Sequence, residues 1–259
     1  MKGMAYHGWK VGLPDKFWPV TLDNFFDNPD EIRELGLRML ESDKYPSPTG
    51  HWPGYRSGPL YRIDEVLAQS ISCRILNCYF NLNWEQVFWN RCNLQFQLIS
   101  SRDKDKNNIK NKGWIHRDGV DPRKHHHPDP GDADDLAGLI YLTPDIERNT
   151  GTSLFDMKKD KTLEHDDSTA ELRTQIHLGN PVNDKEIKEK WEKHRSCFVE
   201  KVRFENIYNR LIMYDTNEFH GVNSYYTPED KDDRLTLGFF MGGIRASKWP
   251  LERIKEIKC

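Results

Sequence analysis

Short segments with an alternating or uniformly apolar pattern dominate the chain after residue 90, and they restrict the fold more than any other feature. They are residues 93–100, 136–144, 152–157, 198–205, 210–215 and 234–243. In the first of them, Leu94, Phe96 and Leu98 alternate with glutamines, as side chains on the two faces of a β-strand do. Several short strands joined by turns and long loops predict an antiparallel sandwich or barrel. No glycine-rich phosphate loop follows any of them, so a nucleotide-binding fold has no support.

Two helices are expected before these strands. The first covers residues 28–40, where Asp27 or Asn28 can cap the helix. The second covers residues 63–80, and its expected core face comprises Ile63, Val66, Leu67, Ile71 and Ile75. Residues 45–59, rich in proline and glycine, should form a loop between them. Helices that back a sheet predict the α+β class with a mainly β core.

We expect a single domain, residues 1–259, because a chain of this length can enclose one large core. Its expected parts are a helical support region (1–90), a core (91–243) with a polar insertion (156–197), and a C-terminal helix (244–259). The insertion should hold one helix, residues 183–195, capped by Asn183. The polar segments 101–113 and 156–197 are either solvated surface excursions or the rim or lid of a pocket.

Composition argues against several classes of protein. A formal net charge of −3 and the absence of a long basic run disfavour nucleic acid as a partner. No stretch reaches the ~18 consecutive apolar residues of a membrane span, and the N-terminal segment lacks the features of a signal peptide. The five cysteines are scattered without a CxxC pair, as in a protein with reduced thiols. We therefore expect a cytoplasmic protein without a membrane partner, and the sequence carries no signal for an oligomeric state.

Three polar residues are candidates to share a metal ion. His116 and Asp118 are two positions apart, and on a strand they would point to one face. His220 follows the apolar strand 210–215 after a short turn, where a core histidine bonded to a backbone carbonyl is the alternative. Two histidines and a carboxylate leave coordination positions open on a metal, as in non-haem Fe(II) oxygenases. The histidine run 125–127 lies instead in a loop of prolines and acids, where we expect solvated side chains.

The last apolar strand contains an arginine. Arg234 and Thr236 are again at positions i and i+2, opposite Leu235 and Leu237. A guanidinium buried in an apolar strand requires an anion, and its planar fork matches a carboxylate. A metal-competent cluster together with a carboxylate receptor is a specific combination.

With these motifs in this order, residues 90–243 resemble the 2-oxoglutarate- and Fe(II)-dependent dioxygenases, specifically the prolyl-4-hydroxylase-like branch. Five ordered elements carry the resemblance: His116-Arg117-Asp118, the strand at 138–144, the turn NTGTSLF at 149–155, His220, and Arg234-Leu235-Thr236. It implies a double-stranded β-helix (jelly-roll) core backed by the N-terminal helices. The turn reads Thr150-Gly151-Thr152 where the family more often has two glycines and an acid.

The same resemblance implies the roles of individual residues. The expected Fe(II) ligands, which are also the catalytic residues, are His116, Asp118 and His220. The residues expected to bind the cosubstrate 2-oxoglutarate are Arg234, Thr236 and Tyr141, with Gln97 lining the same pocket. O₂ is the second cosubstrate, and a small molecule or peptide would be hydroxylated with release of succinate and CO₂. The insertion 156–197 is long for this branch, so the identity of the substrate is not implied, and neither is proline hydroxylation.

Two other functions remain open. A non-catalytic jelly roll of lectin type would bind carbohydrate through exposed tryptophans such as Trp52 and Trp114. A metal-binding barrel of cupin type would use a site richer in histidine. Neither accounts for Arg234 and Thr236, and iron-dependent decarboxylation of 2-oxoglutarate would separate the oxygenase from both.

Overall fold

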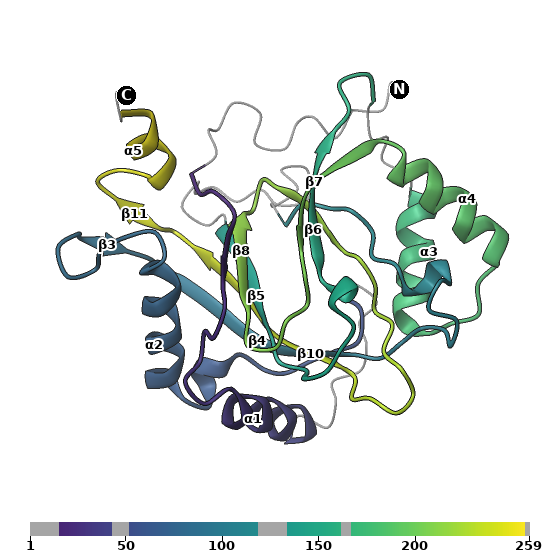
Figure 1. The fold of residues 1–259 in the computed structure, drawn as a ribbon, viewed down its shortest axis with the longest axis horizontal. Coiled ribbons are helices and arrows are strands. Elements are labelled where there is room, and N and C mark those ends of the chain that lie inside the picture. The colour runs from purple at the N-terminus through teal and green to yellow at the C-terminus, as the bar shows by residue number, and fades with distance from the viewer. Residues whose placement is uncertain (1–15, 43–51, 119–133, 162–166, 257–259) are drawn as a thin grey trace.

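The structure is a computed structural model that describes residues 16–42, 52–118, 134–161 and 167–256 (Figure 1). The prediction for the histidine run 125–127 lies outside these residues. Two antiparallel β-sheets pack against each other, and helices lie on the outer sides of both (Figure 1). This arrangement confirms an α+β protein with antiparallel sheets.

The large sheet has six strands in the order β1-β8-β5-β10-β4-β2, and every neighbouring pair is antiparallel. Its strands are β1 (Val20–Leu22), β2 (Tyr55–Arg56), β4 (Arg91–Ile99), β5 (Asp134–Tyr141), β8 (Leu211–Asp215) and β10 (Arg234–Gly242). Strand β10 is central and is buried on both of its faces except at two intermediate positions. Its side chains therefore alternate between the helical layer and the space between the sheets.

The small sheet has the order β7-β6-β9. Its strands are β6 (Thr152–Met157), β7 (Phe198–Phe204) and β9 (Phe219–Val222). His116 extends this sheet by a single antiparallel bridge to His220 on β9. A separate two-stranded ribbon pairs β3 (Val87–Phe88) with β11 (Arg245–Ala246).

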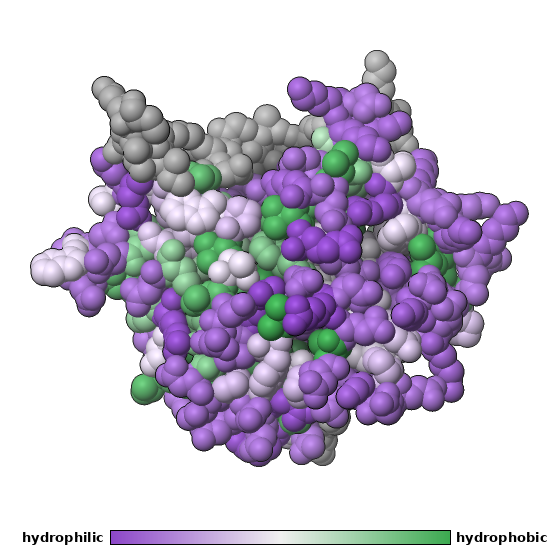
Figure 2. Space-filling model, in the orientation of Figure 1, coloured by the Kyte–Doolittle hydropathy of each residue, from purple (hydrophilic) through white to green (hydrophobic). Residues whose placement is uncertain are grey.

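Five α-helices are present in the described residues: α1 (Pro29–Ser42), α2 (Glu65–Leu76), α3 (Asp167–Leu178), α4 (Asp184–Arg195) and α5 (Pro250–Glu256). Short 3₁₀ helices are η2 (Leu60–Arg62), η3 (Ile109–Asn111) and η5 (Arg148–Thr150). Helices α1 and α2 lie on the side of the large sheet, whereas α3 and α4 lie on the opposite side of the molecule (Figure 1). The surface over α4 is mainly hydrophilic (Figure 2), as its sequence DKEIKEKWEKHR requires.

The main core lies between the large sheet and helices α1 and α2. Leu40, Ile75, Phe96 and Leu237 are all fully buried in it. Helix α1 approaches the sheet closely at Gly36, where an added Cβ would lie 2.4 Å from Cδ1 of Phe96. A second cluster, between the two sheets, contains Ala137, Tyr141, Leu154, Phe204, Ile212 and Tyr214. We call the region between the two sheets, where this cluster lies, the inner chamber.

The six strands predicted after residue 90 correspond to β4, β5, β6, β7, β8 and β10. The expected core face of the second helix was partly wrong, because Ile63 and Val66 are 63% and 77% exposed. The helix begins only at Glu65, after an N-cap at Asp64 whose side chain accepts from the Leu67 backbone N–H. Its buried face is Ala68, Ile71, Ser72, Ile75 and Leu76, at helical spacing.

The polar insertion holds two helices where one was expected. Asn183 caps α4 as predicted, and its Oδ1 accepts from the backbone N–H groups of Lys185 and Glu186. Helix α3 was missed because only Leu172 and Ile176 form its apolar contact, and they pack on Ile187 of α4. Two apolar residues do not establish a helical period in sequence.

Two expectations from composition can be compared with the described residues. Cys73, Cys78, Cys92 and Cys197 are free thiols there. In the same part of the chain, no helix has both the length and the apolar character needed to cross a membrane.

Candidate metal centre

The structure brings His116, Asp118 and His220 together. Their nearest ligand atoms all lie within 4.8 Å of one another. Nε2 of His220 is 3.2 Å from Oδ2 of Asp118, and Nε2 of His116 is 3.7 Å from Oδ1 of the same carboxylate. Three potential ligands from two distant segments therefore converge on one point at the edge of the small sheet.

The backbone explains this convergence. His116 and His220 exchange both backbone hydrogen bonds, each with an N···O distance of 2.9 Å. The strand expected around His116 is reduced to this bridge, and Asp118 lies in irregular backbone beyond it. Side chains of directly opposed residues on an antiparallel pair share one face of a sheet. The two imidazole rings accordingly lie 4.4 Å apart, centroid to centroid.

Both histidines are held in the same tautomer. Nδ1 of His116 lies 2.9 Å from the Trp114 carbonyl oxygen, and Nδ1 of His220 lies 3.1 Å from that of Glu218. A carbonyl oxygen can only accept, so in each ring Nδ1 carries the proton that is donated. Nε2 is then the atom with the free lone pair, and it faces Asp118. Histidines that ligate metals are commonly oriented in this way, by a hydrogen bond from the ring nitrogen that does not bind the metal.

The electrostatics of Asp118 and His116 favour the deprotonated states that ligate a metal. Burial raises the pKa of Asp118, but the two histidines and Arg56 more than offset this and lower it to about 2. Burial and the neighbouring His220 lower the pKa of His116 to about 3. The pKa of His220 is lowered by burial but raised overall by Asp118. An ionised carboxylate beside imidazole is a suitable donor set for a divalent transition metal.

Arg234 is buried without a counter-charge in the described residues. It is 1% exposed, and its Nε and Nη2 atoms have no hydrogen-bond partner. Its guanidinium carbon lies 5.4 Å from the centre of the Tyr141 ring. Burial lowers its pKa, and Tyr141 and Tyr225 oppose that shift. Leaving buried donors of a charged group unpaired costs free energy, so an anion bound at this point would be stabilising.

The other predicted cosubstrate residues lie in one row across the large sheet. Thr236 on β10 is opposite Gln97 on β4 and opposite Tyr141 on β5. Gln97 is in turn opposite Arg56 on β2. These side chains therefore face the inner chamber together with Arg234. The Tyr141 hydroxyl donates to Oγ1 of Thr152 on β6, at 3.1 Å, and so connects the two sheets.

Two residues near the cluster were not found in the sequence. Arg56 stacks on Trp52 at 3.8 Å, its Nη2 lies 3.4 Å from Oε1 of Gln97, and burial lowers its pKa to about 10 although Asp118 opposes this. It lies in the segment expected to be a loop, whose two-residue strand leaves no periodic signal. The ring of Tyr214 lies 4.7 Å from that of His220. Strand β8 is buried at all five positions, so no alternation in its sequence indicates that Tyr214 lies on the inner face.

Trp114 is 6% exposed, so its expected role as an exposed carbohydrate-binding residue was wrong. It is covered by α4, where its ring lies 5.4 Å from that of His194. Helix α4 also contacts the adjacent backbone. Nε1 of Trp191 donates to the carbonyl oxygen of Gly113 at 3.3 Å, and Nε2 of His194 lies 2.9 Å from the carbonyl oxygen of Ile115. The polar insertion thus supports the segment that carries His116.

The chain belongs to a family of unknown function (DUF6445), whose model matches residues 16–241. No curated protein matches it.

Several solved structures are similar at 12% identity. One is a prolyl hydroxylase from Trichoplax adhaerens in complex with a peptide of hypoxia inducible factor, covering 93% of this chain and 87% of that one with a TM-score of 0.44. Another is the viral collagen prolyl hydroxylase of Paramecium bursaria Chlorella virus-1, with 89% and 99% coverage and a TM-score of 0.45. A third is HygX from Streptomyces hygroscopicus with nickel and 2-oxoglutarate bound, with 88% and 83% coverage and a TM-score of 0.47. At this level of likeness, the chemistry has to be inferred from the chain's own side chains.

Proposed function

We propose that this protein is an Fe(II)- and 2-oxoglutarate-dependent dioxygenase that hydroxylates a small molecule or peptide and releases succinate and CO₂. One observation carries the proposal: a two-histidine, one-carboxylate cluster lies in the same structure as a buried arginine that faces the inner chamber with two nitrogen atoms unpaired. A metal-binding protein without a cosubstrate would have no use for the second feature.

The residues present fit Fe(II). His116, Asp118 and His220 would hold the metal through Nε2, a carboxylate oxygen and Nε2, and this set leaves coordination positions open. When bound, the iron supplies the oxidative chemistry with O₂ and 2-oxoglutarate. The hydrogen bonds from the two Nδ1 atoms keep both imidazoles in the ligating tautomer before any metal arrives.

The residues of the large sheet would bind and orient 2-oxoglutarate. Arg234 would pair with the distal carboxylate through its free Nε and Nη2, and Thr236 would donate its hydroxyl to the same group. Tyr141 lies beside both and would complete this binding site, with Gln97 next to Thr236. The apolar side chains of the inner chamber would exclude water from the reacting groups.

For the fold, we propose a double-stranded β-helix. The order β8-β5-β10-β4 in the large sheet and the order β7-β6-β9, continued by His116, in the small sheet support it. We further propose one domain, with a core at 91–243, a support region at 1–90, an insertion at 156–197 and a C-terminal helical segment at 244–259. A cytoplasmic location and a partner other than nucleic acid stay predictions.

The test is iron-dependent turnover of 2-oxoglutarate. We expect purified protein with Fe(II) to release succinate, and one member of a panel of amino acids, peptides and small metabolites to stimulate that release. Asp118→Ala is the matched inactive variant. A protein that binds metal, but neither releases succinate nor is thermally stabilised by 2-oxoglutarate, would be the cupin-type alternative and would end the proposal.

A further inference from the structure

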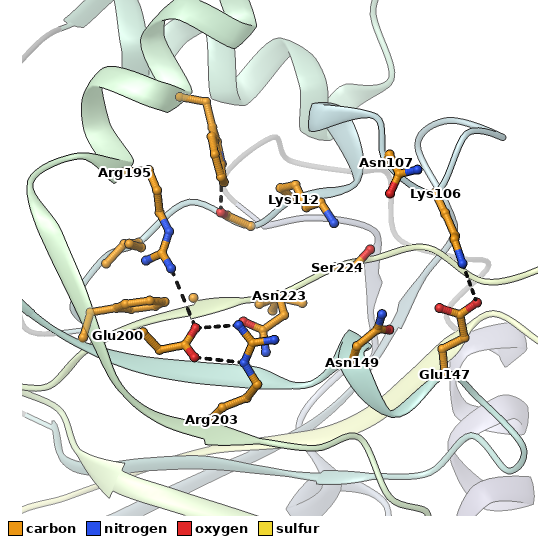
Figure 3. Close-up of a pocket in the computed structure, with 16 residues that line it drawn as sticks. Lys106, Asn107, Lys112, Glu147, Asn149, Arg195, Glu200, Arg203, Asn223 and Ser224 are labelled. Carbon is orange, nitrogen blue, oxygen red and sulfur yellow. Dashed lines mark hydrogen bonds and ion pairs between the residues drawn. The ribbon is translucent and has the colours of Figure 1, made fainter.

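A polar cavity of about 260 Å³ lies on the outer side of the small sheet, away from the inner chamber (Figure 3). Ile115 and Gly221 line it, and they are the chain neighbours of His116 and His220. Successive residues of an extended chain point to opposite faces, so one layer of backbone separates this cavity from the metal centre. Helix α4 covers one side of it with Trp191 and Arg195.

The lining of the cavity carries an excess of positive charge. Four cationic and two acidic side chains line it: Lys106, Lys112, Arg195, Arg203, Glu147 and Glu200. Lys106 pairs with Glu147 at 3.8 Å. Glu200 is shared, because Arg203 donates to both of its oxygens at 2.9 and 2.8 Å and Arg195 lies 3.7 Å away. Lys112 pairs with no carboxylate in the part of the chain that the structure describes. The lining therefore carries a net charge of +2, and Lys112 is its cation without an acidic partner in the described residues.

The uncharged lining residues add further donors. They are Asn149, Asn223 and Ser224, which lie near the centre of the site, and Asn107, which lies beside Lys106 (Figure 3). Oδ1 of Asn223 accepts from the Ser153 hydroxyl at 2.8 Å, whereas its Nδ2 has no partner. Nη1 of Arg195 is likewise buried without a partner. Both acidic side chains are already ion-paired with cations, whereas buried donors of Asn223 and Arg195 have no partner.

We propose that this cavity binds a small dianion, either a dicarboxylate or a phosphate monoester. Such a ligand supplies two negative charges and several acceptor oxygens, which is the complement of the lining. The volume of about 260 Å³ is slightly below that of pockets that hold drug-sized ligands, so it suits a small metabolite. Its binding does not depend on the proposed oxygenase activity, because none of the metal-centre residues lines the cavity.

The experiment is calorimetric titration of the metal-free full-length chain with succinate, glycerol phosphate and inorganic phosphate at low ionic strength. We expect saturable binding of at least one of them, and weakening by tenfold or more in Lys112→Gln, since a hydrogen bond to a charged group is lost. Lys185→Gln on α4 is the matched control, because Lys185 is 85% exposed and lies outside the cavity. It should leave the affinity unchanged. A preference for glycerol phosphate over succinate, or the reverse, identifies the source of the dianion.

A second variant distinguishes binding in this cavity from binding in the proposed 2-oxoglutarate pocket. Dianion binding should persist in Arg234→Gln, because residue 234 faces the inner chamber and not the cavity. The proposal is overturned if no dianion binds, if acetate binds as well as the dianions, or if Lys112→Gln has no effect. Binding that is lost in Arg234→Gln but kept in Lys112→Gln also overturns it, because the ligand would then be in the inner chamber.

Discussion

Replacing Arg234 by glutamine tests the anion receptor most directly. Without a ligand, the buried guanidinium has two nitrogen atoms unpaired, which costs about 1–3 kcal/mol per unsatisfied group. Glutamine removes that charge, so the ligand-free variant should be at least as stable as the wild type. With 2-oxoglutarate bound, the situation reverses, because removing one partner of a buried charge pair costs about 2–5 kcal/mol. That range corresponds to a roughly 30- to 4,000-fold weaker affinity for the cosubstrate.

Thermal denaturation with a redox-inert divalent metal and an unreactive 2-oxoglutarate analogue measures both effects. At 100 times its dissociation constant, a ligand stabilises by about 2.7 kcal/mol, which raises Tm by roughly 5–10 °C in a chain of this size. If the variant binds 100 times more weakly, the same concentration stabilises by about 0.4 kcal/mol, or about 1 °C. Arg38→Gln, at a side chain 65% exposed on α1, is the control and should respond like the wild type.

Two results would refute this reasoning. An equal rise in Tm for Arg234→Gln and the wild type would show that the analogue does not need the guanidinium. A ligand-free variant that is several kcal/mol less stable would show that Arg234 already has a structural partner. In the second case, the argument from unpaired donors would be wrong even if the enzyme were an oxygenase.

Three further predictions address the metal centre, the insertion and the core. Asp118→Ala should abolish succinate release and metal binding, and unchanged succinate production would contradict the proposed centre. Burial lowers the pKa of His194 to about 4. Because this side chain then binds more protons in the unfolded state between pH 4 and 6.5, His194 alone should lower the stability by at most about 3 kcal/mol as the pH drops through that range. His194→Asn should flatten this dependence in urea denaturation, and an identical pH profile would count against it. Gly36→Ala should destabilise by about 1–3 kcal/mol because its Cβ would clash with Phe96. Gly238→Ala, whose Cβ would have its nearest neighbour at 3.9 Å, should be close to neutral in the same assay.

The prediction of six strands succeeded for local reasons. The alternation along 93–100 and the apolar run around Arg234 indicate which side chains share one face of a strand. Because side chains alternate strictly along a strand, this assignment holds in any sheet that buries one of the two faces. Asn183 was readable as a helix cap because capping depends on neighbouring backbone alone. The separation of His116 and Asp118 by one residue belongs to the same kind of local information.

Where the sequence was insufficient, the decisive contact came from a distant segment. Val66 has the right character for a core residue, yet the sheet meets α2 on another face, so it is exposed. Trp114 was expected at the surface, but α4, about 80 residues later in the chain, covers it. Arg56 lies in a strand of two residues, too short to show an alternating pattern in the sequence. It comes near the metal centre only because β2 pairs with β4.

The amino-acid sequence therefore determined the strands, the residues able to ligate a metal and the presence of an arginine in an apolar strand, since each depends on side chains a few positions apart. The tertiary structure alone decided that Nε and Nη2 of Arg234 lack a hydrogen-bond partner, that Arg56 joins the site, and that a cationic cavity lies behind the metal-bearing backbone. The physical reason is that burial and charge balance are sums over all neighbours in space, and most of those neighbours are far apart along the chain.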